Sequence, residues 1–372
     1  MKKTFLTLFI LFPVLLAFNA CNDPVFYMLS QEIKVAKPLI RGSATNFVVS
    51  GNHTYVASGS SLYRYNGGLD SQGRGNWTRD SGLPSAPGRR IMQLAVTDDY
   101  LYALCEGSNS RGVIKRATFP EPFQWQDLTG SFNNVQAIFA VNNLLFIGAR
   151  NSNGSYSVYY EGNLNSPIPG GENLTILRGV AFNGANYFLC TADDLYYTPS
   201  PDLGLQLVPG DSRNYMGIIN LGSSGGNRIF AIARNGDLFS VTTNGRSRRA
   251  RFSDRRRATG TLAVWTNGID NLLLAGRQDV SYSTSSGFTY GYVEISFDSS
   301  GITETLFRIP GEPGAVSTVI NRNRYVNSIG KNPVNHLIQA PDGILLASTQ
   351  KFGVWSLRYR GNDKSETWNA EE

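Results

Sequence analysis

The chain has 372 residues and a formal net charge of +6, with 41% hydrophobic, 12% aromatic and 17% charged residues. Its 39 glycines, 20 phenylalanines and 18 tyrosines favour turns and half-buried pleated sheets, and no long helical periodicity is present. With two histidines and no cluster of His, Cys and carboxylates at ligand spacing, the sequence predicts no metal and no cofactor.

The N-terminus predicts export. Lys2 and Lys3 precede an apolar run at residues 5–18, and the small residue Ala20 follows it. The run is shorter than the roughly 20 residues of a membrane span. We therefore expect residues 1–20 to be a secretory signal peptide. No later segment is long and apolar enough to span a bilayer.

Cys21 follows this segment directly, in the run Phe18-Asn19-Ala20-Cys21. The run resembles the lipobox of bacterial lipoproteins, in the looser form of spirochaetes and some Bacteroidetes. The resemblance implies a lipidated Cys21 and a cell-envelope address on the inner or outer membrane. Two or three acyl chains anchor a protein stably where one does not. Simple secretion, with cleavage elsewhere, is the alternative.

One short strand pattern repeats along the rest of the chain. Seven segments rich in Leu, Tyr and Phe are each followed by a polar turn and another strand. Their central residues lie 42 to 47 positions apart, except for a last interval of 72. These residues are Tyr55, Tyr102, Phe146, Phe188, Phe230, Leu273 and Leu345. Such a period is typical of propeller blades.

The repeat predicts an all-β, seven-bladed β-propeller with four antiparallel strands per blade, spanning residues 43–372. Hairpin turn residues, such as those at 235–236, separate the strands. In the sixth repeat, residues 280–283 are the predicted third strand, and an insertion near 296–325 accounts for the long interval. Trp77, Trp125 and Trp368 mark outer strands. A linear solenoid is the alternative, but the terminal repeats are not atypical.

Ring closure has two solutions at this stage. Trp368 suggests that the last blade makes its own outer strand, whereas residues 25–40 could instead supply it. Residues 21–42 are otherwise a lipidated tether. Cys105 and Cys190 fall on equivalent strands of blades two and four, which do not touch, so we expect two buried free thiols.

Residues 246–257 are the most basic stretch of the chain. Its arginines are Arg246, Arg248, Arg249, Arg251, Arg255, Arg256 and Arg257. One interpretation is a solvated edge that discourages strand pairing. The other is a patch for an anionic partner, such as lipid headgroups, an anionic polymer or an acidic protein face. Nucleic acid is disfavoured, because the signal peptide directs the chain out of the cytoplasm.

The sequence shows no catalytic constellation. His53 lies at a predicted hairpin turn, and His336 lies in the innermost strand of the last blade, where it is a candidate channel residue. No Gly-x-Ser-x-Gly elbow occurs. Glycoside hydrolysis needs two facing carboxylates, which sequence alone does not place.

A degenerate motif carries a second resemblance. Ser283, Ser285, Gly287 and Tyr290 follow the spacing of the Asp-box, Ser-x-Asp-x-Gly-x-x-Trp, without its Asp and Trp. The chain thus resembles bacterial propellers related to sialidase-type and sortilin-type repeats. Its plan is also similar to propeller lipoproteins that scaffold outer-membrane protein assembly. At the level of fold alone, such likeness carries little functional weight.

Together these features predict an exported, lipid-anchored, non-enzymatic interaction or scaffold protein. Its partner would be a protein or glycan that the propeller loops bind. A carbohydrate-binding or sialidase-like glycoside hydrolase propeller is the alternative. A subunit of an envelope assembly machine is a third hypothesis. Exposed aromatics and carboxylates at the channel mouth would favour carbohydrate chemistry, and mixed polar residues without a carboxylate pair would favour the interaction module.

Overall fold

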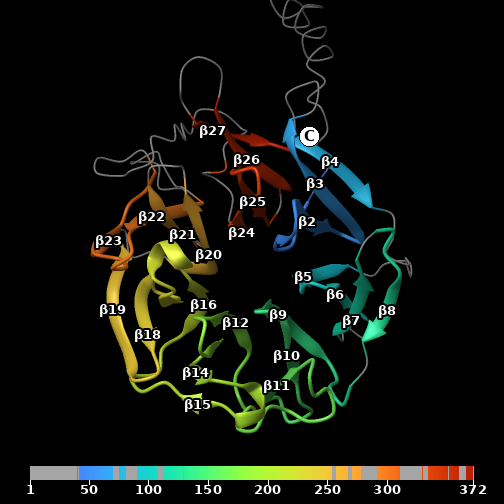
Figure 1. The fold of residues 1–372 in the computed structure, drawn as a ribbon, viewed down its shortest axis with the longest axis vertical. Coiled ribbons are helices and arrows are strands. Elements are labelled where there is room, and N and C mark those ends of the chain that lie inside the picture. Colours follow the sequence, from blue (N-terminus) through green and yellow to red (C-terminus); the bar gives the residue numbers. More distant parts are fainter. Residues whose placement is uncertain are drawn as a thin grey trace, which may run out of the picture. The chain divides into compact units, whose positions relative to one another are not determined.

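Seven β-sheets form a ring in the computed structural model, with the innermost strands around a central channel (Figure 1). The structure describes residues 40, 42–69, 75–80, 90–107, 112–119, 121–128, 130–253, 257–266, 270–277, 291–310, 329, 334–350, 352–359 and 366–371. All of them belong to one unit, residues 40–371. The predictions for the signal peptide, Cys21 and the tether fall, apart from positions 40 and 42, outside the described residues.

Four blades contain four antiparallel strands each, ordered from the channel outwards. Blade one consists of β1 (Val48–Ser50), β2 (His53–Ser58), β3 (Ser61–Leu69) and β4 (Gly75–Asp80). Blade two consists of β5 (Ile91–Val96), β6 (Tyr100–Glu106), β7 (Gly112–Thr118) and β8 (Trp125–Leu128). Blade four consists of β12 (Leu177–Phe182), β13 (Tyr187–Thr191), β14 (Leu195–Thr198) and β15 (Gln206–Leu207). Blade seven consists of β24 (Val334–Gln339), β25 (Leu345–Thr349), β26 (Val354–Tyr359) and β27 (Glu366–Ala370).

The other three blades vary this plan at the rim. Blade three consists of β9 (Val135–Val141), β10 (Leu144–Arg150) and β11 (Tyr156–Tyr160). Blade five consists of β16 (Tyr215–Asn220), β17 (Ile229–Ala233), β18 (Asp237–Thr242) and β19 (Gly245–Phe252). Blade six consists of β20 (Ala258–Thr266), β21 (Asn271–Arg277) and β22 (Tyr292–Phe297). Two 3-10 turns, η3 (Pro201–Leu203) and η4 (Ser223–Gly225), lie in loops. The predicted seven-bladed, all-β propeller is confirmed.

The short strand β23 (Leu306–Phe307) joins the rims of blades five and six. It pairs in parallel with β19 through Arg251 and Phe252. The next residue, Arg308, exchanges two backbone hydrogen bonds of 2.8 and 2.9 Å with Glu294 of β22. The segment 306–308 therefore pairs with both blades, with β22 of blade six and with the last residues of β19 in blade five.

Blade six differs from the prediction in its third strand. Residues 280–283, predicted as that strand, lie outside the described residues, and β22 takes the place beside β21. Within the predicted insertion near 296–325, residues 296–297 end β22 and residues 306–307 form β23 at the rim. The rest of that prediction, beyond residue 310, lies outside the described residues. Two apolar segments, 280–283 and 292–297, follow β21 in the chain, and apolar patterning alone does not decide which of them pairs with it.

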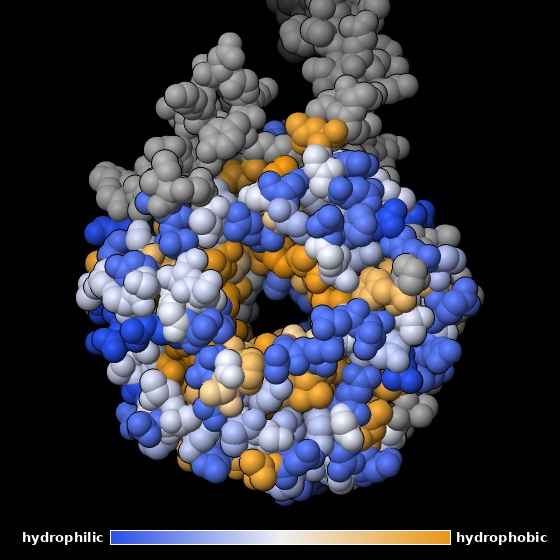
Figure 2. Space-filling view, in the orientation of Figure 1, coloured by the Kyte–Doolittle hydropathy of each residue, from blue (hydrophilic) through white to orange (hydrophobic). Residues whose placement is uncertain are grey.

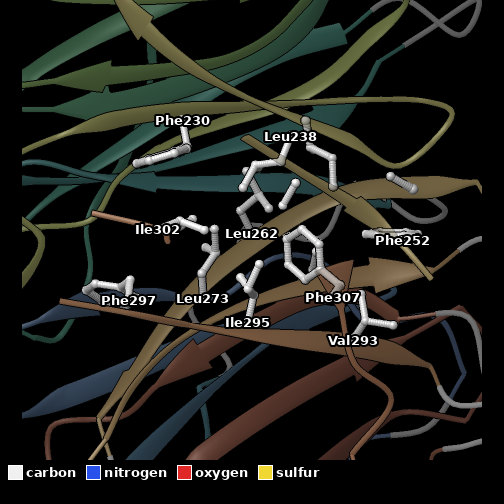
Figure 3. Packing of buried hydrophobic residues seen from close by; sticks show 14 of the residues in the cluster. Phe230, Leu238, Phe252, Leu262, Leu273, Val293, Ile295, Phe297, Ile302 and Phe307 are labelled. Atoms are coloured by element: carbon white, nitrogen blue, oxygen red, sulfur yellow. The ribbon is translucent and has the colours of Figure 1, made fainter. Parts of the chain in front are cut away.

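The apolar core lies between the blades. The buried apolar residues of the described chain form seven clusters, and each cluster spans two neighbouring blades. Figure 3 shows the cluster of blades five and six, where Phe230 and Leu238 face Leu273 and Ile295. A blade is therefore stable only beside its neighbours, as expected for stacked repeats. The predicted free thiols are confirmed, since Cys105 and Cys190 lie buried on β6 and β13.

The last blade supplies its own outer strand, because β27, which contains Trp368, pairs with β26. Side chains then join blade seven to blade one. The buried carboxylate of Glu371 accepts hydrogen bonds from the Trp77 indole at 2.8 Å and the Gly75 amide at 3.1 Å. It also accepts one from the Ser356 hydroxyl of its own blade. This carboxylate thus links blade seven to blade one at the rim, in addition to the backbone hydrogen bonds that join Ala44 to Thr349 and Gly353 to Gly42.

Candidate binding site at the channel mouth

A register shift near the start of every innermost strand shapes one mouth of the channel. In β5 the shift falls between Ile91 and Gln93, and blade one shows the same change between its pairs Val48↔Tyr55 and Ala44↔Ser58. The residues within these shifts are Thr45, Met92, Gln136, Arg178, Met216, Thr259, Gly260, Thr261 and Asn335. A bulge re-aims its extra side chain, and all of these residues line the central cavity.

The cavity has a volume of about 730 Å³ and opens to solvent. Figure 2 shows the opening at the centre of the ring. Its lining is mostly neutral, with amide, hydroxyl and aliphatic side chains from the innermost strands. Among the described residues that line it, Arg90 and Arg178 are the charged ones, and there is no carboxylate.

Two of the amide side chains in the lining are used to join blades. Asn46 of blade one donates to the Leu94 carbonyl at 2.8 Å and accepts from the Leu94 amide at 2.8 Å. Gln93, at the equivalent position of blade two, donates to the Ile138 carbonyl at 2.5 Å and accepts from the Ile138 amide at 3.0 Å. Each side chain thus pairs with both the backbone N–H and the backbone C=O of one residue of the next blade and is not available to a ligand.

His336 occupies the same register position in blade seven. It lies in β24 and lines the cavity, and its Nδ1 accepts a hydrogen bond from the Phe47 amide of blade one at 3.3 Å. Burial lowers the pKa of His336 to about 4, so the imidazole is neutral at pH 7 and able to accept. The candidate channel residue therefore joins the last blade to the first.

The side chains left for a ligand are few. Arg90 is exposed at the start of β5, and Arg178 is half-buried within the bulge of β12. Neither arginine side chain has a hydrogen bond or ion pair to another described residue, and the Arg178 Nε is shielded from solvent without a partner. Met92 and Met216 add flexible apolar surface on the neighbouring strands. This arrangement offers positive charge next to apolar contact.

The arginine-rich stretch lies on β19, as expected, but its first member is structural. The Arg246 side chain is 3% exposed, donates to Asp194 of blade four at 3.2 Å and lies 5.5 Å from the centre of the Tyr215 ring. It is therefore unavailable to an external anion. Arg248, Arg249, Arg251 and Arg257 are exposed, with Arg248 3.9 Å from Asp237. Arg255 and Arg256 lie outside the described residues.

Within the described chain, no group of three or more His, Cys, Asp or Glu side chains could hold a metal ion. No helix in that part of the chain is long and apolar enough to cross a membrane. The Asp-box-like residues 283–290 fall outside the described residues.

Sequence analysis missed Arg178, although a signal for it exists. Thr45, Met92, Gln136 and Arg178 each lie ten residues before the central residue of the following strand. A constant offset in a repeat marks equivalent positions, so this column could be aligned from the sequence. That the column lines a channel mouth follows only from the bulges, which do not alter the spacing of apolar residues.

Comparisons with known proteins identify the fold and no family. No protein-family model and no curated protein matches the sequence. The structure is similar to the extracellular domain of a hybrid two-component system from B. thetaiotaomicron, with a TM-score of 0.59 and 13% identity. The match covers 86% of this chain and 39% of that one, so the chain spans about two fifths of its length.

Two smaller proteins match over nearly their whole length. YCF48 from Cyanidioschyzon merolae has a TM-score of 0.52 and 12% identity, over 86% of this chain and 96% of that one. A streptogramin B lyase structure has a TM-score of 0.50 and 12% identity, over 85% and 94%. Because the identities are this low, these similarities establish a β-propeller fold and leave the function open.

Proposed function

We propose that this protein is an exported, lipid-anchored binding protein that captures a ligand or partner at the channel mouth and its surrounding loops. The observation that carries the proposal is the mouth itself, an open cavity of about 730 Å³ ringed by re-aimed bulge side chains. A rigid ring of strands that presents polar side chains and loops at one opening is suited to recognition.

The lining favours binding over glycoside hydrolysis. A glycosidase of the usual kind places two carboxyl groups across the scissile bond. The described residues of the cavity lining contain no carboxylate. Titratable groups with strongly shifted pKa values, such as Tyr102 and Tyr55, lie in the contacts between blades, and burial raises their pKa. We therefore propose a non-enzymatic role.

The proposed address rests on residues 1–21. A signal peptide would export the chain, and acylation of Cys21 would hold it at the inner or outer membrane of a bacterial envelope. Mass spectrometry of the detergent-extracted protein should find acyl chains on the N-terminal Cys21 peptide. Cys21→Ser should move the protein to the soluble fraction. Membrane retention of that variant, together with an unmodified wild-type peptide, would contradict lipid anchoring.

Co-purification is the test of the binding role. The full-length protein, extracted in mild detergent after chemical cross-linking, should recover a stoichiometric protein or glycan. Recovery of a glycan that is then cleaved would favour the carbohydrate hypothesis. Release of the partner by substitutions at the mouth, but not at the rim, would support capture there. Equal release by both sets would contradict it.

The exposed arginines of β19 offer a second contact for an anionic partner. Arg248, Arg249 and Arg251 project from the rim, whereas Arg246 holds blades four and five together. Replacing these three by serine in a Cys21→Ser background should weaken binding to anionic phospholipid vesicles at low salt, because fewer cations face the surface. Unchanged binding would leave β19 as a solvated edge.

A further inference from the structure

We infer that the channel mouth binds an oxyanion, a carboxylate or phosphate group carried on an apolar body, through the guanidinium of Arg178. The inference deepens the proposed binding function, on which it rests, by naming the chemistry of the ligand. It starts from one exception in the ring of bulge residues. Of the residues in those shifts, only Arg178 carries a charge.

Arg178 lies in a bulge of β12, where its side chain lines the cavity. The shift in β12 between Leu177 and Gly179 leaves Arg178 outside the regular ladder, so its side chain is free of the alternation that buries Leu177. It lines the cavity together with Gln136 on one neighbouring strand and Met216 on the other. A bulge at this place re-aims a side chain towards the opening.

The charge of Arg178 is not balanced within the described chain. Its guanidinium forms no ion pair there, and its Nε is inaccessible to solvent without a hydrogen-bond acceptor. The Cys190 thiol interacts electrostatically with it, but burial raises the pKa of Cys190, so the thiol is neutral. A half-buried cation with donors to spare stabilises an anion more than an exposed one does.

Other arginines of this propeller show how such a charge is otherwise satisfied. Arg64 and Arg116 bind Glu121 and Glu161 of the next blade, and Arg246 binds Asp194. Each of these arginines has a structural carboxylate partner, whereas Arg178 faces the cavity without one. Because the described lining contains no acid, a carboxylate or phosphate that pairs with Arg178 at the mouth would come from a ligand.

The residues near Arg178 indicate the chemical character of the rest of the ligand. Asn46, Gln93 and His336 are occupied in contacts between blades. Arg90 adds a second cation at the mouth, and Met92 and Met216 add apolar surface. The site therefore fits an oxyanion group attached to an apolar chain or ring. A planar guanidinium binds both carboxylate and phosphate through two parallel hydrogen bonds.

Calorimetric titration of the full-length protein in detergent tests the site. The probes are inorganic phosphate, acetate and hexanoate, each at constant ionic strength. At least one should bind, and hexanoate should bind more tightly than acetate, because Met92 and Met216 add apolar contact; equal affinities would contradict the apolar part of the inference. Arg178→Gln should weaken that binding at least about tenfold, because a charge-assisted bidentate contact is lost. Arg178→Lys should fall between the two, since it keeps the charge and loses the fork.

Arg213→Gln is the matched control, because Arg213 is 47% exposed, pairs with Asp211 and is not part of the cavity lining. Circular dichroism and unfolding temperature report whether each variant is folded. Absence of binding by all three probes, or equal affinity of the wild type and a folded Arg178→Gln variant, would overturn the inference.

Failure of this inference and failure of the proposed function give different results. A partner that co-purifies equally with the wild type and Arg178→Gln would keep the binding function and remove the oxyanion site. Oxyanion binding that depends on Arg178, without any recovered partner, would keep the site and remove the captured macromolecule.

Discussion

Six of the seven seams between innermost strands are joined in one of two ways, and at the seventh, between blades six and seven, the Leu337 amide donates to the Thr261 hydroxyl oxygen at 3.1 Å. From blade seven through blades one and two to blade three, side chains clamp each seam, by His336 on Phe47, Asn46 on Leu94 and Gln93 on Ile138. We call these seams the clamped arc. From blade three to blade six, the equivalent positions hold Ala137, Gly179 and Gly217, and we call these seams the close-packed arc.

Close packing takes the place of the amide clamps at this register position of the second arc, while farther along the seam of blades four and five the Asn220 side chain donates to the Phe182 carbonyl at 2.5 Å. A Cβ atom on Gly217 would lie 2.1 Å from the Gly260 carbonyl oxygen, and one on Gly179 would lie 3.0 Å from the Ile218 side chain. Backbones that approach so closely leave no room for an amide side chain. The clamped arc has room, and its seams contain peptide groups that need partners.

The clamped arc is the one that includes the first and the last blade of the chain. The clamped arc contains the one seam whose two blades are not consecutive in sequence, blade seven against blade one, where Glu371 and Asp342 add further contacts. Chain connectivity does not hold that seam together. Directional hydrogen bonds with fixed partners specify which surfaces meet there, in addition to the apolar cluster between the blades.

The largest expected effect is at the closing seam. Glu371→Ala leaves the Gly75 amide, the Trp77 indole and the Ser356 hydroxyl without their shared acceptor. Each buried donor left unpaired costs about 1–3 kcal/mol, so we expect unfolding free energy to fall by about 3–5 kcal/mol. Urea unfolding followed by tryptophan fluorescence measures it. Glu172→Ala, at an exposed site, is the control. Equal stability of both variants would show that the carboxylate does not close the ring.

In the close-packed arc, we expect substitutions that add side-chain volume to destabilise the protein. Gly217→Ala places its methyl group against the backbone of blade six, which cannot rotate away, whereas the methyl group of Gly179→Ala first meets the Ile218 side chain, at the longer distance of 3.0 Å. We expect about 2–3 kcal/mol of destabilisation for the first variant and less than about 1 kcal/mol for the second. Thermal unfolding of the two proteins compares them. If Gly179→Ala is the more damaging, the seams are not packed as described.

Asn46→Ala tests the clamps from the other side. The variant removes the partner of both the backbone amide and the backbone carbonyl of Leu94, which lie between blades one and two. A loss of about 1–3 kcal/mol is expected. Asn66→Ala removes two hydrogen bonds of an exposed amide on the rim, to Asn76 and Thr78, and should cost little because water replaces them. Similar losses for both would mean that the clamp is as exposed to water as the rim.

Much of the fold could be predicted from the sequence, because propeller strands carry local signals. The second strands are apolar on both faces. Turn residues such as Asn142 and Asn143, both with positive φ, connect the first strand of a blade to the second. Trp77, Trp125 and Trp368 correctly marked outer strands. These features depend on neighbours within one blade.

The candidate site was not predictable in the same way. A bulge shifts register by one or two residues without changing which residues are apolar, so Arg178 resembled any polar residue in a strand. Arg246 resembled a surface charge, because its partner Asp194 lies 52 positions away. The contact of Glu371 with Trp77 spans 294 positions. Pairings between blades of this kind become visible only once the ring is assembled.

The smallest expected effect is a loss of stability at low pH, caused by protonation of His336. Burial lowers the folded-state pKa of His336 to about 4, below the ordinary value of 6.5. Between those values the unfolded chain binds more protons than the folded one. The free energy of unfolding is therefore not reduced by His336 above about pH 6.5, and it falls as the pH drops towards 4. Because the residue is only half-buried, we expect a loss of about 1–2 kcal/mol across that window.

His336→Gln isolates this contribution. The side-chain oxygen of glutamine can accept from the Phe47 amide, as Gln93 does from Ile138, but it does not titrate in this range. The variant should match the wild type at pH 7.5 and be more stable at pH 4.5, in paired urea titrations at the two values. An unchanged acid slope in the variant would assign that slope to other groups. A loss of stability at pH 7.5 would show that the seam needs the imidazole ring itself and not only an acceptor for one amide.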